Sequence, residues 1–357
     1  MEAGMAVKAG VLAAHKDAEV IVKPLADGGE GTTDALIEGL NGERVDVTVT
    51  GPYHEPVNAY YGYLKDTNTA VMEMASAAGI TLVTKKDPLR ASTYGVGEMI
   101  ADALKRGCKN FMIGIGGSAT NDGGIGMLKA LGFEFFDEDG NDVGEGAAAL
   151  VKIEVIRTEN KNPLLSGAKF QIACDVKNPL CGKQGATYIF GPQKGVTEEQ
   201  KEQVDEAMRH YADVTKESLD CDFADCEGAG AAGGLGYAFL SYLAGELIPG
   251  VELILQATGL EEKMKNADVV VTGEGRLDAQ TVMGKAPVGV AALAKKYNAK
   301  VIAFAGSVAP EASVCNQAGI DAFFPIVRGA CTLEEAMQRE KAMENLTDSV
   351  EQVFRLL

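Results

Sequence analysis

The feature that most constrains this chain is the way its glycines are grouped. It contains 43 glycines among 357 residues, well above the usual share of roughly 7%. They gather in short segments that also carry carboxylates, amides or hydroxyls. The five segments are ADGGEGT (26–32), GIGGSATNDGG (114–124), CDVKNPLCG (174–182), GAGAAGGLG (228–236) and TGEGRLDAQ (272–280). Such grouping predicts tight turns at which the backbone comes close to a ligand.

Apolar runs that predict β-strands lead into at least two of these segments. The run at 110–115 precedes the second segment, and the run at 267–272 precedes the fifth. The C-terminal region continues as expected helix 286–297, strand 300–305, helix 310–318 and strand 322–327. This βα alternation predicts a parallel sheet with helices on its faces. Ligands of open α/β sheets bind at the carboxyl ends of the strands, so the glycine segments there are candidate sites.

The remainder of the chain has a less regular pattern. A buried strand is expected at 18–25, ending in the first glycine segment, and an antiparallel meander at 44–50, 59–64 and 69–74. Further strands are expected at 170–174 and 186–190. Apolar spacing predicts helices at 1–15, 32–40, 97–105, 126–131 and 197–219. A capping box of Thr197 and Gln200 marks the start of the helix at 197–219.

Length and composition indicate two globular domains. The chain has 357 residues, 46% of them hydrophobic and 24% charged, which is enough for two cores. No run approaches the roughly 20 apolar residues of a membrane helix, and no signal peptide is recognisable. Seven dispersed cysteines without a C-x-x-C pair indicate reduced thiols in a cytoplasmic protein. The net charge of −18 argues against a nucleic-acid surface, although helix N-termini can still hold small anions.

The second glycine segment carries the sharpest chemical pattern. Its glycine N–H groups, hydroxyls and following helix suit an anion cradle, while the oxygens of Asn121 and Asp122 suit Mg²⁺. The alternative is a simple turn with a helix cap. A turn needs one or two such polar residues, whereas this segment has four among its glycines, which favours a site. Its candidate residues are Gly116, Gly117, Ser118, Thr120, Asn121 and Asp122.

The fifth and first segments offer carboxylates near turns. Glu274 and Asp278 flank Arg276, an arrangement that fits cation coordination, phosphate clamping or a surface ion-pair network. The expected strand end favours a site. Asp27 and Glu30 lie on a turn that enters a helix, where they are either ligand contacts or acidic residues favouring a helix N-terminus.

Two further segments place polar residues in expected loops. Asp175 and Asn178 follow the strand at 170–174, and Lys194 lies in FGPQKG (190–195). Lys194 between Gln and Gly suits a phosphate contact, with solvated surface as its alternative.

The string GAGAAG at 228–233 matches a dinucleotide fingerprint only literally. The acidic stretch before it is no apolar strand, and no ribose-binding acid follows at the expected distance. A glycine-rich helix start that packs closely or approaches a ligand is the preferred interpretation. The run from Gly275 to Lys285 is not a Walker loop, because its spacing is too long.

The order and separation of the motifs add a resemblance. ADGGEGT, GIGGSATNDGG, ACDVKNPL, FGPQKG, GAGAAGGLG and VVTGEGRLDAQT resemble the bacterial glycerate kinases of the first type over nearly the whole chain. The resemblance implies ATP-dependent phosphorylation of D-glycerate to a phosphoglycerate, with 2-phosphoglycerate as the expected isomer. It also implies two α/β domains, one flavodoxin-like with a parallel sheet, and an active site in the cleft between them. We expect residues 1–85 with 265–357 to form one lobe and residues 86–264 to form the other.

The implied reaction requires positioning and charge neutralisation more than covalent chemistry. ATP and Mg²⁺ are the implied cofactors and D-glycerate the substrate, with no nucleic acid or membrane partner; a homodimer is left open as the assembly. We assign catalysis to Asp122, Asp175, Glu274 and Arg276, with Asp122 and Glu274 also as Mg²⁺ ligands. Nucleotide contacts are assigned to Gly116, Gly117, Ser118, Thr120, Asn121 and Lys194, and substrate contacts to Asp27, Glu30, Asn178 and Asp278.

One departure from the family pattern concerns the first residues. Relatives begin with an apolar strand and a Pro-Asp-Ser-Phe-Lys-Gly-like loop, whereas Met1 to Gly4 already correspond to the helix that follows. Two explanations are open: a misassigned start codon or a truly truncated product. In the second case the product is expected to be less stable, because its sheet would expose an edge, and to be a weak or inactive kinase.

Two rival functions remain at this stage. An oxidoreductase that binds a nucleotide or a sugar phosphate is suggested by GAGAAG and would be stabilised by NAD(P) rather than by ATP with Mg²⁺. A non-enzymatic sensor of a hydroxy acid would bind glycerate without releasing ADP.

Overall fold

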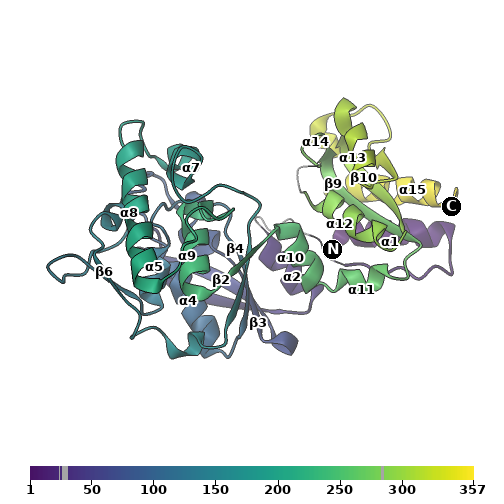
Figure 1. The fold of residues 1–357 in the computed structure, drawn as a ribbon. Helices are drawn as coiled ribbons and strands as arrows, with labels where there is room; N and C mark the ends of the chain where they lie inside the picture. The colour runs from purple at the N-terminus through teal and green to yellow at the C-terminus, as the bar shows by residue number, and fades with distance from the viewer. Residues whose placement is uncertain (24, 26–30, 283–284) are drawn as a thin grey trace. The chain divides into compact units, whose positions relative to one another are not determined.

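The structure, a computed structural model, describes residues 1–23, 25, 31–282 and 285–357. The chain divides into two compact units, one of residues 28–253 and one of residues 1–27 with 254–357 (Figure 1). Both combine helices and strands, and the largest sheet is mostly parallel, so the predicted α/β class is confirmed. No helix within the described ranges is both long and apolar enough to span a membrane.

The larger unit is built on a six-stranded sheet with the order β1-β2-β3-β4-β7-β8. Its first three strands form the predicted antiparallel meander, and β3, β4, β7 and β8 run parallel. A separate antiparallel pair joins β5 and β6. The strands are β1 (Glu43–Thr50), β2 (Pro56–Leu64), β3 (Thr69–Glu73), β4 (Asn110–Gly114), β5 (Glu134–Phe136), β6 (Val155–Arg157), β7 (Lys169–Ala173) and β8 (Glu246–Ile248).

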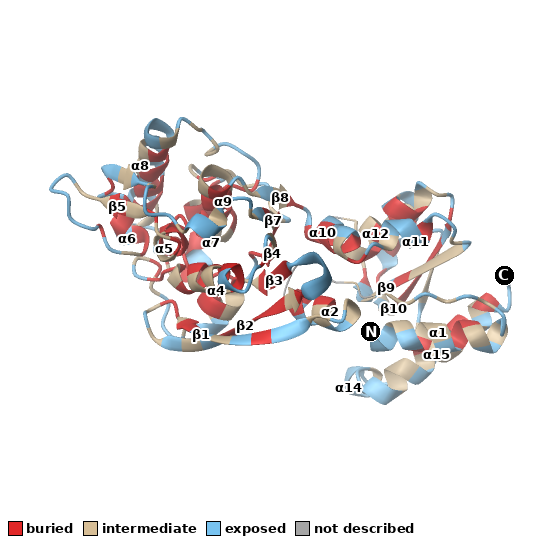
Figure 2. Ribbon diagram, turned by 90° about the horizontal axis from the view of Figure 1, so that it is seen from below, coloured by how far each residue is buried: buried red, intermediate tan, exposed pale blue. Residues whose placement is uncertain are grey.

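Helices of the larger unit cover both faces of this sheet. They are α2 (Thr32–Gly39), α3 (Ala75–Ala78), α4 (Tyr94–Lys105), α5 (Ile125–Ala130), α6 (Ala147–Leu150), α7 (Ala186–Lys194), α8 (Lys201–Leu219), α9 (Leu235–Leu243) and α10 (Gly250–Ala257), the last of which continues beyond this unit. α4 packs on β1 and β2, α9 on β7 and β8, and α2 on β2 and β3. Buried residues are concentrated on α4, α5 and α9, while α8 has an exposed outer side (Figure 2).

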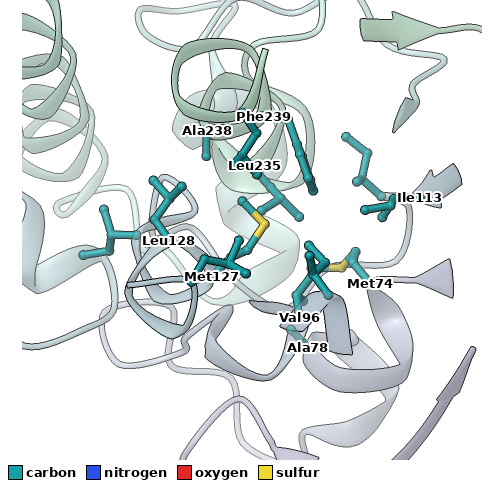
Figure 3. Packing of buried hydrophobic residues seen from close by; sticks show 14 of the residues in the cluster. Met74, Ala78, Val96, Ile113, Met127, Leu128, Leu235, Ala238 and Phe239 are labelled. Carbon is teal, nitrogen blue, oxygen red and sulfur yellow. The ribbon is translucent and has the colours of Figure 1, made fainter. Parts of the chain in front are cut away.

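The main core lies on one face of the six-stranded sheet. Alternate residues of the central strands, such as Met72, Ile113 and Ile172, point to this face, as the period of two requires. They meet apolar side chains of α4, α5 and α9, including Val96 and Phe239 (Figure 3). Burying each large side chain of this kind contributes about 1.5–3 kcal/mol, so this face fixes the strands that carry the site.

The smaller unit contains a three-stranded parallel sheet with the order β11-β10-β9. The strands are β9 (Val269–Leu277), β10 (Lys300–Val308) and β11 (Ala322–Pro325). The helices are α1 (Glu2–Ala14), α11 (Leu260–Met264), α12 (Ala286–Lys295), α13 (Val314–Gln317), α14 (Leu333–Ala336) and α15 (Arg339–Phe354). The predicted βα alternation and parallel sheet are therefore confirmed.

The first and last long helices of the chain pack together within the smaller unit. Val11 of α1 joins Val350 and Phe354 of α15 in one core. A Cβ at Gly10 would overlap the backbone of Thr347, so glycine permits the close approach of the two helices. Residues at opposite ends of the sequence thus complete one core.

Glycines also extend two strands beyond their predicted ends. β9 was expected to end at 272 and β10 at 305, but they stay paired to Leu277 and Val308. A Cβ at Gly273 would overlap the carbonyl oxygen of Phe304, and one at Gly306 would approach that of Gly275. The glycines therefore allow close strand pairing where the sequence pattern predicted a turn.

Four other expectations differ from the structure. Residues 18–23 form no strand: Val20 rests against the smaller core while Ile21 is about half exposed. Residues 186–190 lie in α7 instead of a strand. The helix expected at 197–219 starts only at Lys201; of the two capping-box hydrogen bonds, the one from the Thr197 N–H to the Gln200 side chain is formed. The expected lobe boundary at 85 also differs from the division near residue 28, because β3 pairs directly with β4.

A matched pair of substitutions tests the role of glycine in β9. Gly273→Ala should lower the free energy of unfolding by about 2 kcal/mol, within the usual cost of overpacking, because its methyl group meets backbone. Gly275→Ala, where a Cβ meets no atom within 4 Å, should change it by no more than about 0.5 kcal/mol. Urea denaturation monitored by circular dichroism measures both, and equal effects would contradict the packing argument.

Candidate functional site

The carboxyl ends of four neighbouring parallel strands lie at one edge of the larger sheet. Glu73 ends β3 and is level with Gly114 of β4, which is level with Ala173 of β7. Ala173 in turn is level with Ile248 of β8. The glycine loop after β4 (residues 115–124, hereafter the glycine loop) and Asp175 after β7 therefore start from one edge, where ligands of such sheets bind.

Backbone hydrogen bonds fix the beginning of the glycine loop. The Ile80 N–H donates to the Gly117 carbonyl (2.8 Å), and the Ala119 N–H donates to the Ala78 carbonyl (2.9 Å). Gly117 has φ of +73°, which favours glycine. Gly116 and Gly117 are exposed, and among the described residues their N–H groups have no acceptor. The tip of the loop thus presents two backbone donors to solvent, as an anion cradle requires.

The next residues of the glycine loop turn inward. Ser118 is 7% exposed, and Thr120 and Asn121 are fully buried. Asn121 Nδ2 donates to Thr187 Oγ1 of α7 (3.1 Å). The Asn121 Oδ1 and Thr120 Oγ1 atoms are buried and have no hydrogen-bond partner among the described residues, which is uncommon in folded proteins. They are the unsatisfied buried side-chain atoms closest in sequence to the exposed loop tip.

Lys194 was expected in a loop as a phosphate contact, but it lies at the end of α7, behind the glycine loop. It is the last residue of α7 and only 2% exposed. Its Nζ donates to Ser118 Oγ (2.7 Å) and to the Thr120 carbonyl (2.6 Å). Burial lowers the pKa of Lys194 to about 7, and the negative charge of Asp122 opposes that shift. The burial of Lys194 contradicts the alternative of a solvated surface lysine.

Asp122 has an internal role in this structure. Its Oδ2 accepts from the Thr93 N–H (2.9 Å), Thr93 Oγ1 (2.8 Å) and the Gly126 N–H (3.3 Å), and its Oδ1 accepts from the Gly124 N–H (3.2 Å). It is fully buried. Burial raises its pKa, against the effect of these hydrogen bonds. Asp122 joins the starts of α4 and α5, so the predicted roles in catalysis and Mg²⁺ binding do not fit its geometry.

A stability measurement tests this reassignment of Asp122. Asp122→Asn sets an amide group against backbone donors and should cost about 2 kcal/mol or more of unfolding free energy. The control Asp142→Asn alters a half-exposed carboxylate paired with Lys129 and should cost less than about 1 kcal/mol. Chemical denaturation compares them. An Asp122→Asn variant with unchanged stability and weakened Mg²⁺ affinity would restore the metal assignment.

Asp175 and Asn178 lie beyond β7 at the same sheet edge as the glycine loop. Asp175 is exposed, and its Oδ1 accepts from the Gly250 N–H at the start of α10 (2.9 Å). Asn178 Nδ2 donates to the Gln184 carbonyl (2.7 Å), and the Asn178 carbonyl accepts from the Gly230 N–H (3.0 Å). Asp175 is thus accessible to a ligand, whereas Asn178 mainly holds its own loop.

The glycines at 228–236 pack against backbone. A Cβ at Gly230 would overlap the Pro179 carbonyl, one at Gly233 the Thr120 carbonyl, and one at Gly236 the Gly228 carbonyl. The Gly123 N–H donates to the Gly233 carbonyl (2.9 Å). This segment supports the glycine loop from inside, in agreement with the interpretation of close packing over that of a dinucleotide fingerprint.

The smaller unit holds a second group of predicted site residues. Lys285 Nζ lies 3.5 Å from Glu274 Oε2 and 4.0 Å from Asp278 Oδ1. Thr281 Oγ1 donates to Glu274 Oε1 (2.6 Å), and Arg276 Nε lies 3.7 Å from Asp278 Oδ2. Glu274, Arg276 and Asp278 are therefore brought together as predicted. Glu274 and Arg276 belong to β9 itself and not to a turn after it.

Among the described residues, the carboxylates of Glu274 and Asp278 best fit a divalent cation. Both lie within 4.0 Å of one ammonium nitrogen, so their oxygens face a position that already suits positive charge. Mg²⁺ in phosphate-transfer sites commonly takes only one or two carboxylates and completes its shell with phosphates and water. In the described ranges, no group of three or more His, Cys, Asp or Glu side chains is arranged to hold a metal by itself.

Two predicted residues are not described, and two others were missed. Asp27 and Glu30 lie outside the described residues. Glu73, which no motif marked, accepts from the Thr33 N–H (2.8 Å) and the Gly31 N–H (3.3 Å) at the start of α2. A carboxylate directly after an apolar strand was the available signal. Lys285 was considered only as part of a Walker loop, and its place before a Pro-containing helix start was the signal overlooked.

Known proteins resemble this chain along nearly its whole length. Residues 1–357 match the profile of the Glycerate kinase family. Glycerate kinase of Bacillus subtilis (strain 168) is 46% identical over 340 residues, 95% of this chain and 89% of that protein. Glycerate 2-kinase of Escherichia coli (strain K12) is 45% identical over 339 residues, 94% of this chain and 89% of that protein. A crystal structure assigned as glycerate kinase 2 from Salmonella typhimurium LT2 matches with a TM-score of 0.91 and 42% identity, covering 99% of this chain and 93% of that one.

Proposed function

We propose that this chain, which belongs to the glycerate kinase family, transfers the γ-phosphoryl group of ATP to a hydroxyl group of D-glycerate. The observation that carries the proposal is the family match across residues 1–357, with 46% identity to a glycerate kinase. The name of the Escherichia coli relative, glycerate 2-kinase, favours 2-phosphoglycerate as the product. Seven cysteines that are all free thiols favour the cytoplasm as its compartment.

The glycine loop is the proposed site for ATP phosphates. Gly116 and Gly117 offer exposed N–H groups without an acceptor in the described structure. Preorganised backbone donors stabilise the negative charge that moves during phosphoryl transfer, and they need no reorganisation at that moment. Ser118, Thr120 and Asn121 then shape the loop from within, and Lys194 supports them. This division revises the expectation that all six residues touch the nucleotide.

Asp175 is the proposed group for the substrate hydroxyl. It is exposed at the carboxyl end of β7, next to the strand that carries the glycine loop. In phosphoryl transfer a carboxylate can orient the attacking hydroxyl and accept its proton. Asp122 is unsuited to this task because its oxygens are buried and occupied.

The charged group of the smaller unit is the proposed site for the metal and further phosphate contacts. Glu274 and Asp278 would hold Mg²⁺, which neutralises phosphate charge when bound. Arg276 and Lys285 would neutralise phosphate or the substrate carboxylate. Their ion pairs with the two carboxylates keep these cations in place before a ligand arrives.

A coupled ADP-release assay tests the proposed function directly. With D-glycerate, ATP and Mg²⁺ the protein should release ADP continuously, and the product should be 2-phosphoglycerate by ³¹P nuclear magnetic resonance. Omission of Mg²⁺ should abolish turnover. Glycerate binding without ADP release would instead indicate a sensor, and stabilisation by NAD(P) alone would indicate an oxidoreductase.

Gly116→Ala tests the proposed phosphate site without disturbing the fold. A Cβ at this position meets no atom within 4 Å, so the melting temperature should stay unchanged. The methyl group would occupy space that a phosphate needs, and the KM for ATP should rise roughly tenfold or more, the loss of about 1.4 kcal/mol of binding. Gly275→Ala, whose Cβ also meets no atom within 4 Å, is the control for the melting temperature. An unchanged KM for ATP would place the phosphates elsewhere.

A further inference from the structure

One helix, α7, supplies side-chain hydrogen bonds to the inner residues of the glycine loop. Two side chains of α7 bind it: Lys194 reaches Ser118 Oγ and the Thr120 carbonyl, and Thr187 accepts from Asn121 Nδ2. The three bonds fall on residues 118, 120 and 121, directly after the exposed tip at Gly116 and Gly117. α7 thus holds the inner residues of the loop through three hydrogen bonds.

The position of Lys194 at the end of α7 favours a positive charge and fixes the backbone of this residue. Lys194 ends α7, where the helix dipole favours positive charge, and Gly195 follows with φ of +104°. The chain then turns back, since the Val196 N–H donates to the Gly191 carbonyl (3.0 Å). This turn fixes the backbone from which the side chain extends inward.

Burying an ammonium group here needs an explanation beyond packing. Burial of an ionised group costs several kcal/mol unless it is compensated, and an apolar side chain of similar volume would fill the same space. Two of the three N–H donors of the ammonium are used, and both bind the glycine loop. The free-energy cost of burying this ammonium is therefore offset by hydrogen bonds to the loop that we propose binds phosphate.

We propose that Lys194 is a positioning residue for nucleotide binding: it holds Ser118 and Thr120 so that the N–H groups of Gly116 and Gly117 face outward, and it places a buried positive charge directly behind this loop. This inference rests on the proposed function for the identity of the ligand. Lys194 does not touch the phosphates, because it is 2% exposed and bound to the inner side of the loop.

The charge state of Lys194 should respond to the ligand. A neutral amine keeps two N–H donors, so both bonds to the loop survive loss of the proton. A bound polyphosphate favours the ammonium form and raises its pKa, which lies at about 7 in the free protein. Nucleotide binding near neutral pH should therefore take up a proton.

Few other charges face this ammonium. Asp122, in the same loop, is the charged group that acts on it. The turn Ala231–Gly233, which packs on α7, contains no titratable residue, and Asp205 of α8 is bound to the Gly182 N–H (2.9 Å). Lys86, whose Cβ lies beside Gly195, belongs to an exposed segment. Proton uptake can thus be attributed to Lys194 by substitution.

Three variants of the whole chain test the proposal. Lys194→Met removes the charge and both hydrogen bonds, Lys194→Arg keeps a charge that does not titrate, and Lys152→Met changes an exposed lysine of the same unit as a control. The measurements are KM and kcat for ATP, hydrogen–deuterium exchange of residues 114–122, and calorimetric titration with Mg–ATP in two buffers of different ionisation enthalpy.

Lys194→Met should raise the KM for ATP roughly tenfold or more with a smaller effect on kcat, and should speed amide exchange in 114–122 without global unfolding. Proton uptake should occur in the wild type and the control and disappear in both Lys194 variants. Lys194→Arg should retain more nucleotide affinity than Lys194→Met. Unchanged KM and uptake in Lys194→Met would overturn the proposal. A large loss of kcat with normal loop exchange would do so too, because it would indicate direct contact with the reacting phosphate.

The outcome separates this inference from the proposed function. Nucleotide binding with uptake that depends on Lys194, but without phosphorylation of glycerate, would contradict the function and leave the positioning role intact. If the wild type phosphorylates glycerate and the Lys194→Met variant is equally active, the proposed function stands and the positioning role of Lys194 is contradicted. If Lys194→Met does not fold, the uptake measured for Lys194→Arg decides, since an uptake equal to that of the wild type contradicts the proposal.

Discussion

The larger unit depends on the in-register parallel pairing of β3, β4 and β7. This pairing places Glu73, the glycine loop and Asp175 at one edge of the sheet, although about 100 residues separate the first from the last. Large apolar side chains on the face packed by α4, α5 and α9 fix the strands in this register. A shift of one residue in the pairing would turn those side chains to the other face of the sheet. The register that buries the core is therefore also the register that places the candidate site residues at one edge.

Much of the fold could be predicted from the sequence because its periodicities are strong. The meander at 43–73, the parallel strands of the smaller unit and the helices α4, α5 and α8 follow from apolar spacing and turn residues. The errors arose where tertiary contacts override local pattern. Glycines in β9 and β10 indicated turns but permit close strand pairing, and the apolar run at 18–23 lacks a strand partner among the described residues.

The sequence pattern indicates where candidate site residues lie more clearly than what each of them does. The glycine loop and the group around Glu274 are candidates because several polar residues and glycines adjoin apolar strands. Side-chain direction was not available from the pattern. Asp122 and Lys194 both looked like ligand contacts, yet both are buried and bind their own chain. A phosphate-binding lysine and a lysine that supports a loop have the same sequence signature, and only burial distinguishes them.

The packing of α1 against α15 has a consequence for how the protein is made. α1 is synthesised long before its partner helix, which covers residues 339–354. At about 5–20 residues per second, its apolar face waits on the order of tens of seconds, while residues 28–253 can already fold. A chaperone that shields short apolar helices during translation should therefore bind nascent chains of this protein, and it should release them once residues 339–354 have emerged.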